Sequence, residues 1–230
     1  MSKWYFSLSI LFVSFSICAQ PLVSTYSANA VDKNGNIQYT ENYELTKNEK
    51  GESLKIKTTY LNLAGKKIAE LESDFQNDPY IPETVFTDFR FNEKQTLHYD
   101  PKSKIIQMKL LDMKTGKFQE KKLKREDNMV SGQGFHNFIL KNFELEKSDI
   151  KFIVLSKLDF FSFKLESSSS ETPSNKRFVL KISNWLLRAM VQQITVDYRI
   201  NDKTLLKFAG LTNIEADNRD SQILTIQYPL

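Results

Sequence analysis

The chain has 230 residues, of which 40% are hydrophobic and 26% are charged, with a formal net charge of +4 from 32 basic and 28 acidic side chains. This length suits one all-β domain and is enough to bury a large core. The near balance of charge does not by itself indicate a partner, and we expect no nucleic acid to bind.

Residues 1–19 have the features of a secretory signal peptide. One early charge, Lys3, precedes an apolar run from Trp4 to Ile17, which is too short to span a bilayer. We therefore expect cleavage after Ala19, export to the periplasm or cell envelope, and a single β-rich domain over residues 20–230.

The chain's one cysteine, Cys18, lies at the end of this segment. Cleavage after Ala19 would remove it, so the mature chain would have no disulfide and no cysteine zinc site. The alternative is a lipoprotein in which Cys18 becomes the first mature residue. That signal requires a small residue before the cysteine, and Ile17 stands there.

Short segments of alternating apolar and polar residues fill the chain between residues 24 and 124, separated by turn sequences such as Asn34-Gly35. Alternation of this kind is typical of strands with one buried face. Because the connections are short, we expect neighbouring strands to pair as an antiparallel meander. The expected strands are 24–32, 37–45, 53–63, 68–75, 85–91, 96–99, 104–112 and 118–124.

The segment 102–126 is basic, with nine lysines and arginines against three acidic residues. It could face an anionic surface. Lysines that alternate with apolar residues on a strand are more typical of a solvated face that resists aggregation, which is the interpretation we favour.

The stretch 129–146 is the one part of the chain that does not have a strand pattern. Phe135, Phe138, Ile139 and Phe143 recur at helical spacing and predict a helix with one aromatic face, with Ser131 as its N-cap. A helix this short is marginal in water, so we expect its face to pack on the inner side of a sheet.

His136 lies at the edge of that face. It could be a general base or a metal ligand, but we favour a hydrogen-bonding residue at the boundary of the core. Ser131 is not in a nucleophile motif, because it precedes both nearby glycines. His98 is expected in a strand, and neither histidine has metal-ligand spacing. Asp74 and Asp78 lie in a turn-like polar stretch, where we expect solvated turn residues. We therefore expect no catalytic constellation, metal or cofactor.

After the helix, the expected strands are 151–155, 158–166, 177–182, 194–200, 204–208 and 223–228. The segment 185–191 is ambiguous between helix and strand. The serine-rich segment 167–175 is expected to be a solvated hairpin tip.

These elements predict a mainly β fold, an antiparallel meander curled into a half-barrel or incomplete barrel around one central helix. Its concave face would be lined with aromatic rings, which either form plain core or hold an apolar ligand. Phe135, Phe138, Ile139 and Phe143 are the candidate ligand-binding residues.

The hairpins at 24–63, the helix at 132–143 and the closing strands at 198–228, after a signal sequence, resemble the curved-sheet envelope proteins of bacteria. These include the periplasmic lipoprotein carriers and related uncharacterised exported families. The resemblance rests on element order and implies a cell-envelope location and a concave surface for a lipid or lipidated protein. It assigns no site residue, because no family motif falls on this chain.

Two other functions are open from the sequence. An outer-membrane β-barrel fits the number of strands, although lysines and glutamates occur on nearly every strand. A hydrolase could use His136 as its base, with Ser131 or a strand carboxylate as its partner. For the favoured binding protein, any membrane association is expected to be peripheral.

Overall fold

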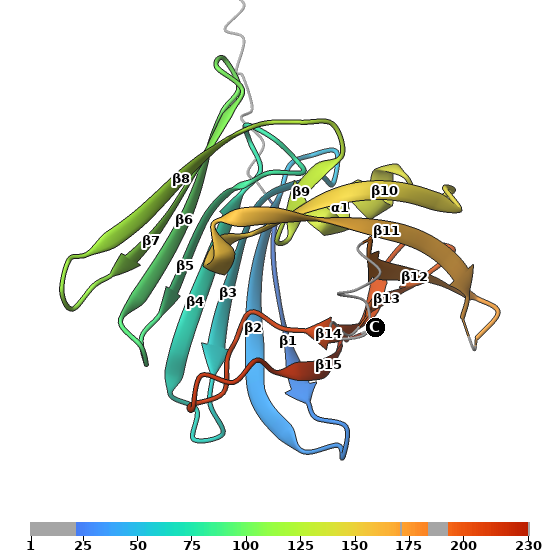
Figure 1. Ribbon diagram of the computed structural model, residues 1–230. Coiled ribbons are helices and arrows are strands. Elements are labelled where there is room, and N and C mark those ends of the chain that lie inside the picture. Colours follow the sequence, from blue (N-terminus) through green and yellow to red (C-terminus); the bar gives the residue numbers. More distant parts are fainter. Residues whose placement is uncertain (1–21, 171, 184–192, 230) are drawn as a thin grey trace, which may run out of the picture.

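The computed structural model describes residues 22–170, 172–183 and 193–229 (Figure 1). The expected signal peptide at 1–19 and the ambiguous segment 185–191 lie outside these residues. The described part is mainly β, as predicted, with one α-helix, α1 (Gly134–Lys141), and one 3-10 turn, η1 (Leu155–Lys157). None of the helices in these ranges has the length and apolarity that a membrane span requires.

The strands follow the predicted segments, with one addition and one extension. In chain order they are β1 (Leu22–Val31), β2 (Ile37–Lys47), β3 (Ser53–Leu61), β4 (Lys67–Asp74), β5 (Glu83–Asp88), β6 (Glu93–Asp100), β7 (Ile105–Asp112), β8 (Phe118–Lys124), β9 (Met129–Ser131), β10 (Lys147–Val154), β11 (Asp159–Ser169), β12 (Asn175–Ile182), β13 (Ile194–Arg199), β14 (Leu205–Leu211) and β15 (Ile223–Gln227). Strand β9 lies in the stretch for which no strand was predicted. Strand β11 continues to Ser169, within the serine-rich segment that was expected to be a loop, because Ser167 to Ser169 pair with β12.

All the described strands belong to one sheet, in the order β8-β7-β6-β5-β4-β3-β2-β1-β15-β14-β13-β12-β11-β10-β9. Antiparallel hairpins build both halves, as expected. The sheet is mixed rather than a pure antiparallel meander, because β9 pairs parallel with β10 and the two ends of the described chain meet where β1 pairs with β15.

The two edge strands, β8 and β9, are neighbours in the chain and must lie close together. Fifteen strands about 4.8 Å apart would form a flat sheet about 65 Å wide. The connection between β8 and β9 is residues 125–128, and such a segment spans at most about 17 Å. The sheet therefore curls back on itself without closing, which leaves a concave inner face (Figure 1).

Apolar side chains from both edges of the sheet pack together where the edges approach. One side of this seam contributes Ile81, Leu97, Tyr99, Ile106 and Met108, and the other contributes Met129, Ile153 and Leu158. Burial of this cluster stabilises the curl, because it removes apolar surface of both edges from water.

An ion pair reinforces the seam. Arg125, in the connection between β8 and β9, binds the carboxylate of Asp78, which also accepts hydrogen bonds from the backbone of Tyr80 and Ile81. Asp78 was expected to be a solvated turn residue. It is instead buried, because the curl brings Arg125 over it.

In the chain, helix α1 lies between β9 and β10, and it packs against the connection between β4 and β5 in the N-terminal half of the sheet. Its N-cap is Gln133 rather than the predicted Ser131, which is paired in β9, and no side chain caps it. Gly134 packs so closely on the connection between β4 and β5 that a Cβ atom would lie 2.2 Å from the carbonyl oxygen of Tyr80. The side chain of Asn137 donates to the carbonyl of Pro79 in the same connection.

Candidate functional site

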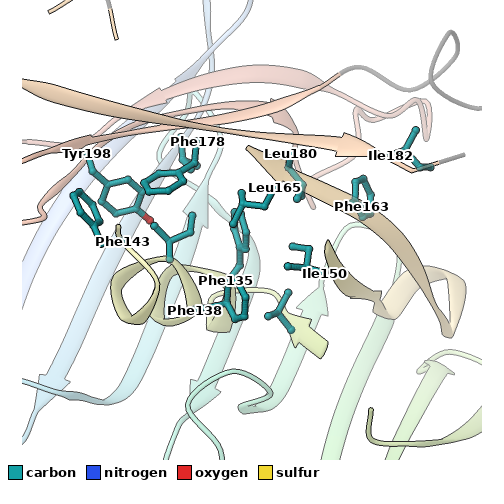
Figure 2. Close-up of a cluster of buried hydrophobic side chains, with 13 residues drawn as sticks. Phe135, Phe138, Phe143, Ile150, Phe163, Leu165, Phe178, Leu180, Ile182 and Tyr198 are labelled. Atoms are coloured by element: carbon teal, nitrogen blue, oxygen red, sulfur yellow. The ribbon is translucent and has the colours of Figure 1, made fainter. Parts of the chain in front are cut away.

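The aromatic face of α1 is covered by the sheet, as predicted. Phe135, Phe138, Ile139 and Phe143 are all buried, although Phe143 follows the end of the helix. Figure 2 shows Phe143 beside Phe178 of β12 and Tyr198 of β13, and its ring centroid lies 5.6 Å from that of Phe178.

These four candidate ligand-binding residues therefore belong to a compact core. We call it the phenylalanine cluster, and it consists of Val130, Phe135, Phe138, Ile139, Phe143, Ile150, Phe163, Leu165, Phe178, Leu180, Ile182, Val196 and Tyr198. The four residues come together as the helical spacing predicted, and their contact with a ligand stays a prediction.

A second cluster lies on the inner face of β1 to β5 and is made largely of tyrosines. The rings of Tyr26 and Tyr43 are stacked with centroids 4.6 Å apart, and Tyr228 meets Tyr43 edge-on at 5.9 Å. Tyr39 and Tyr60 form another edge-on pair at 5.9 Å. We call these five residues the tyrosine cluster.

Glu41 is buried among these rings, with 3% of its surface exposed. Tyr43 donates a hydrogen bond to its carboxylate, and no cation pairs with it within the described ranges. Burial raises the pKa of Glu41 to about 7, although the hydroxyl groups of Tyr43 and Tyr39 favour the charged form.

Sequence reasoning did not single out Glu41. The signal was present, because Tyr39, Glu41 and Tyr43 alternate along β2 and therefore share one face. A tyrosine on either side of an acidic residue at this spacing places the acid on the buried face of the strand.

Part of the inner face is incompletely covered. Ile56, Leu71 and Phe208 face inward beside the tyrosine cluster and are only partly buried, as are two members of that cluster, Tyr26 and Tyr228. Phe208 also contacts the phenylalanine cluster, so this side chain lies between the two cores. We call these five residues the central strip.

Polar atoms without partners lie at the helix end of the inner face. Gln133 donates from Nε2 to Thr58 Oγ1 at 3.0 Å, and Thr58 is the cross-strand neighbour of Leu71. The Oε1 atom of Gln133 and the Oγ atoms of Ser73 and Ser131 are buried without a hydrogen-bond partner, and a fourth such atom, the hydroxyl of Tyr39, lies in the tyrosine cluster. Buried polar atoms of this kind usually bind water or a ligand.

His136 is a hydrogen-bonding residue at the boundary of the core, which confirms the interpretation favoured from the sequence. Its Nδ1 lies 2.9 Å from the hydroxyl of Tyr198, and the two rings are stacked. Burial, together with the nearby charge of Lys47, lowers the pKa of His136 to about 4. Ser131 has no hydrogen bond to His136, so the structure does not bring these two residues together as a nucleophile and base.

Two surface hollows in the described part are lined mostly by polar residues. One, of about 670 Å³, lies at the tip of the serine-rich hairpin between β11 and β12, and is lined by residues such as Glu166, Ser168 and Lys176. The other, of about 300 Å³, lies beside His98, whose Nδ1 is 2.8 Å from Glu83. Neither is lined by the helix residues.

The basic segment 102–126 is largely solvated, as favoured from the sequence. Its strand β8 is an exposed edge, and Lys121 and Lys122 form surface ion pairs with Asp159 and Glu120. No group of three or more His, Cys, Asp or Glu side chains suited to a metal occurs in the part of the chain that the structure describes.

The chain matches no protein-family model, and no curated protein is detectably similar to it. The resemblance to curved-sheet envelope proteins therefore stays a prediction.

Proposed function

We propose that this is an exported protein of the bacterial cell envelope, whose sheet forms a half-barrel that holds an apolar ligand or lipidated partner on its concave face. The observation that carries the proposal is the central strip. It is a run of inward-facing apolar side chains that neither the helix nor the sheet fully covers.

The strip differs from ordinary core in its burial. Apolar residues of the two cores such as Ile139 and Ile226 are buried, whereas Leu71 and Phe208 are only partly buried. Covering exposed apolar surface is favourable by about 25 cal/mol per Å². An acyl chain lying along the strip would gain this free energy without any change in the packing of the two clusters.

The polar atoms at the helix end suit a ligand with one polar end. Gln133 Oε1 can accept a hydrogen bond, and Ser131 Oγ can accept or donate one. Gln133 lies beside Thr58, the cross-strand neighbour of the strip residue Leu71. Helix α1 is anchored in the core by Phe135, Phe138, Ile139 and the following Phe143. This packing fixes the position of Gln133, the N-cap residue of the helix, in the proposed site.

Native mass spectrometry of protein purified from its own envelope tests the proposal directly. We expect a co-purifying lipid mass, and we expect the delipidated protein to take up a fluorescent fatty acid. A clean apo mass together with no fatty-acid uptake would overturn the proposal.

Two tryptophan variants locate the ligand. Leu71→Trp fills space at the central strip and should reduce fatty-acid uptake at least tenfold, while the melting temperature shows that the protein remains folded. Val85→Trp is the matched control, because Val85 lies on the neighbouring strand but is exposed on the outer face. Equal uptake by both variants would place the ligand elsewhere.

The form of the mature protein is a separate prediction. N-terminal sequencing and mass measurement should show cleavage after Ala19, whereas an acylated Cys18 would identify a lipoprotein. The outer-membrane barrel stays an alternative, and recovery of the mature protein from the aqueous phase without detergent would contradict it. The hydrolase would require that His136→Ala abolish any turnover that the protein shows.

A further inference from the structure

The hairpin tips of the N-terminal half differ between the two rims of the sheet. The loops β3–β4, β5–β6 and β7–β8 follow one another along one rim, at the lower left of Figure 1. Loops β2–β3 and β6–β7 lie on the opposite rim, because successive hairpins of an antiparallel sheet alternate in direction.

Large apolar side chains are exposed at each of the three tips on the first rim. Leu63 in the β3–β4 loop is 76% exposed, Phe89 in the β5–β6 loop is 43% exposed, and Met113 in the β7–β8 loop is 40% exposed. Phe118, the first residue of β8, is 57% exposed and adjoins the third tip. We call this surface the apolar rim.

The turn geometry does not require an apolar residue at Leu63. The β3–β4 turn is held by Asn62, whose side chain accepts hydrogen bonds from the backbone of residues 64 and 66. The β2–β3 turn on the opposite rim is held in the same way by Asn48. Its residue equivalent to Leu63 is Glu49, so the same turn can present a charged side chain.

Basic side chains accompany the apolar tips. Segments 62–67, 89–92 and 113–117 hold five basic residues and no acidic residue. Lys67 is paired with Glu70, and Arg90 is paired with Asp88 and with Asp217 of the β14–β15 loop. Lys66, Lys114 and Lys117 form no ion pair in the described ranges. The tips on the opposite rim, 48–52 and 100–104, hold three basic and three acidic residues and no large aliphatic or aromatic residue.

From this pattern we infer that the apolar rim docks the protein on an anionic lipid bilayer, with Leu63, Phe89 and Met113 entering the interface and the unpaired lysines contacting lipid headgroups. Apolar groups that project from a basic surface match the layers of such a membrane, which is apolar below and negatively charged at its surface. The polar tip of the β1–β2 loop, residues 32–36, marks where the docking surface ends on this rim.

This inference goes beyond the proposed function, because the docking surface uses loops and not the concave face. Docking at the rim would hold the concave face beside a membrane from which a lipid could enter it. Membrane docking can be lost without loss of ligand binding on the concave face, and ligand binding can be lost without loss of docking.

Vesicle co-sedimentation of the mature protein provides the test. We expect binding to vesicles made of equal parts phosphatidylglycerol and phosphatidylcholine, and little binding to phosphatidylcholine alone. Lys66→Gln and Lys117→Gln should each weaken binding about fivefold, since one lysine near an anionic surface contributes about 1 kcal/mol. The double variant Leu63→Asn, Met113→Asn should weaken binding at least tenfold.

Ile200→Asn is the matched control, because Ile200 is 44% exposed at a hairpin end on the opposite rim. It should bind vesicles like the unmodified protein. Melting temperatures establish that all variants are folded. Fatty-acid uptake in solution should be unchanged in the rim variants, which separates this result from the test of the concave face.

Failure of the unmodified protein to bind the anionic vesicles would overturn the inference. An equal loss of binding in Ile200→Asn and in the Leu63, Met113 double variant would also overturn it, because binding would then not depend on this rim.

Discussion

The phenylalanine cluster and the tyrosine cluster lie on the same face of the same sheet, yet they are built differently. Phenylalanine and aliphatic side chains fill the first, with Tyr198 its one tyrosine among the described residues. The second surrounds the carboxyl group of Glu41 with tyrosines and is covered in part by the β14–β15 loop, in which Ile214 is fully buried.

The difference reflects what covers each cluster. Helix α1 presents an aromatic face to the sheet, so purely apolar side chains can pack against it. The β14–β15 loop brings polar groups with it, and the side chain of Asn213 donates to the hydroxyl of Tyr60 at 3.0 Å. Tyrosine suits this end because its ring packs in the core while its hydroxyl meets a polar partner.

Truncation of a helix ring should have the largest effect and tests the role of the phenylalanine cluster. If the cluster is core alone, Phe138→Ala should lower the free energy of unfolding by about 3–5 kcal/mol in urea titrations and leave fatty-acid binding unchanged. A smaller loss of stability together with altered fatty-acid binding would show that Phe138 lies beside the ligand.

The tyrosine cluster should make stability depend on pH through Glu41. Its pKa is raised in the folded protein, from 4.5 to about 7, so its contribution to stability is complete below pH 4.5 and decreases as the pH rises through about 7. Glu41→Gln removes this titration. We expect it to exceed the unmodified protein in stability by roughly 3 kcal/mol or less at about pH 9.

Measurement of unfolding free energy across pH for both proteins isolates Glu41, because the contribution of His136 is common to them. Tyr39, Tyr43, Tyr60 and Tyr228 face Glu41 and remain neutral, since burial raises their pKa values. Parallel stability curves for the two proteins would show that Glu41 does not titrate in this range.

The contact between α1 and the β4–β5 connection joins the two halves of the sheet. Adding one methyl group at Gly134 tests how tight this contact is. Gly134→Ala would place a Cβ atom against the backbone of Tyr80, so we expect a loss of about 2 kcal/mol in urea titrations. Gly132→Ala is the control, because its Cβ would meet no atom within 4 Å and its cost should be about 1 kcal/mol, from its positive φ. If Gly132→Ala proves the more damaging, α1 is not held tightly at Tyr80.

Local sequence predicted most of the elements. Alternation predicted the strands of β1 to β8, and turn residues such as Gly35 and Gly65, both at positive φ, marked their hairpins. The helical spacing of Phe135 and Phe138 predicted α1. These predictions succeeded because each depends on residues that are near one another in the chain.

The wrong predictions concern residues whose environment is set by distant segments. Ser131 was expected to cap the helix, but the pairing of β9 with β10 takes it into the sheet. Asp78 was expected in solvent, but Arg125, 47 residues later, covers it. Neither partner can be identified from local periodicity.

The sequence by itself thus determined most of the segments that become strands or helix, because side-chain alternation and turn chemistry are local. Tertiary structure alone decided that β1 pairs with β15 and that β8 and β9 meet at a seam. It also decided that Glu41 is enclosed by tyrosines while the central strip is left partly uncovered. These features depend on the curvature of the whole sheet, which is the sum of many strand pairings and is not specified by any one segment.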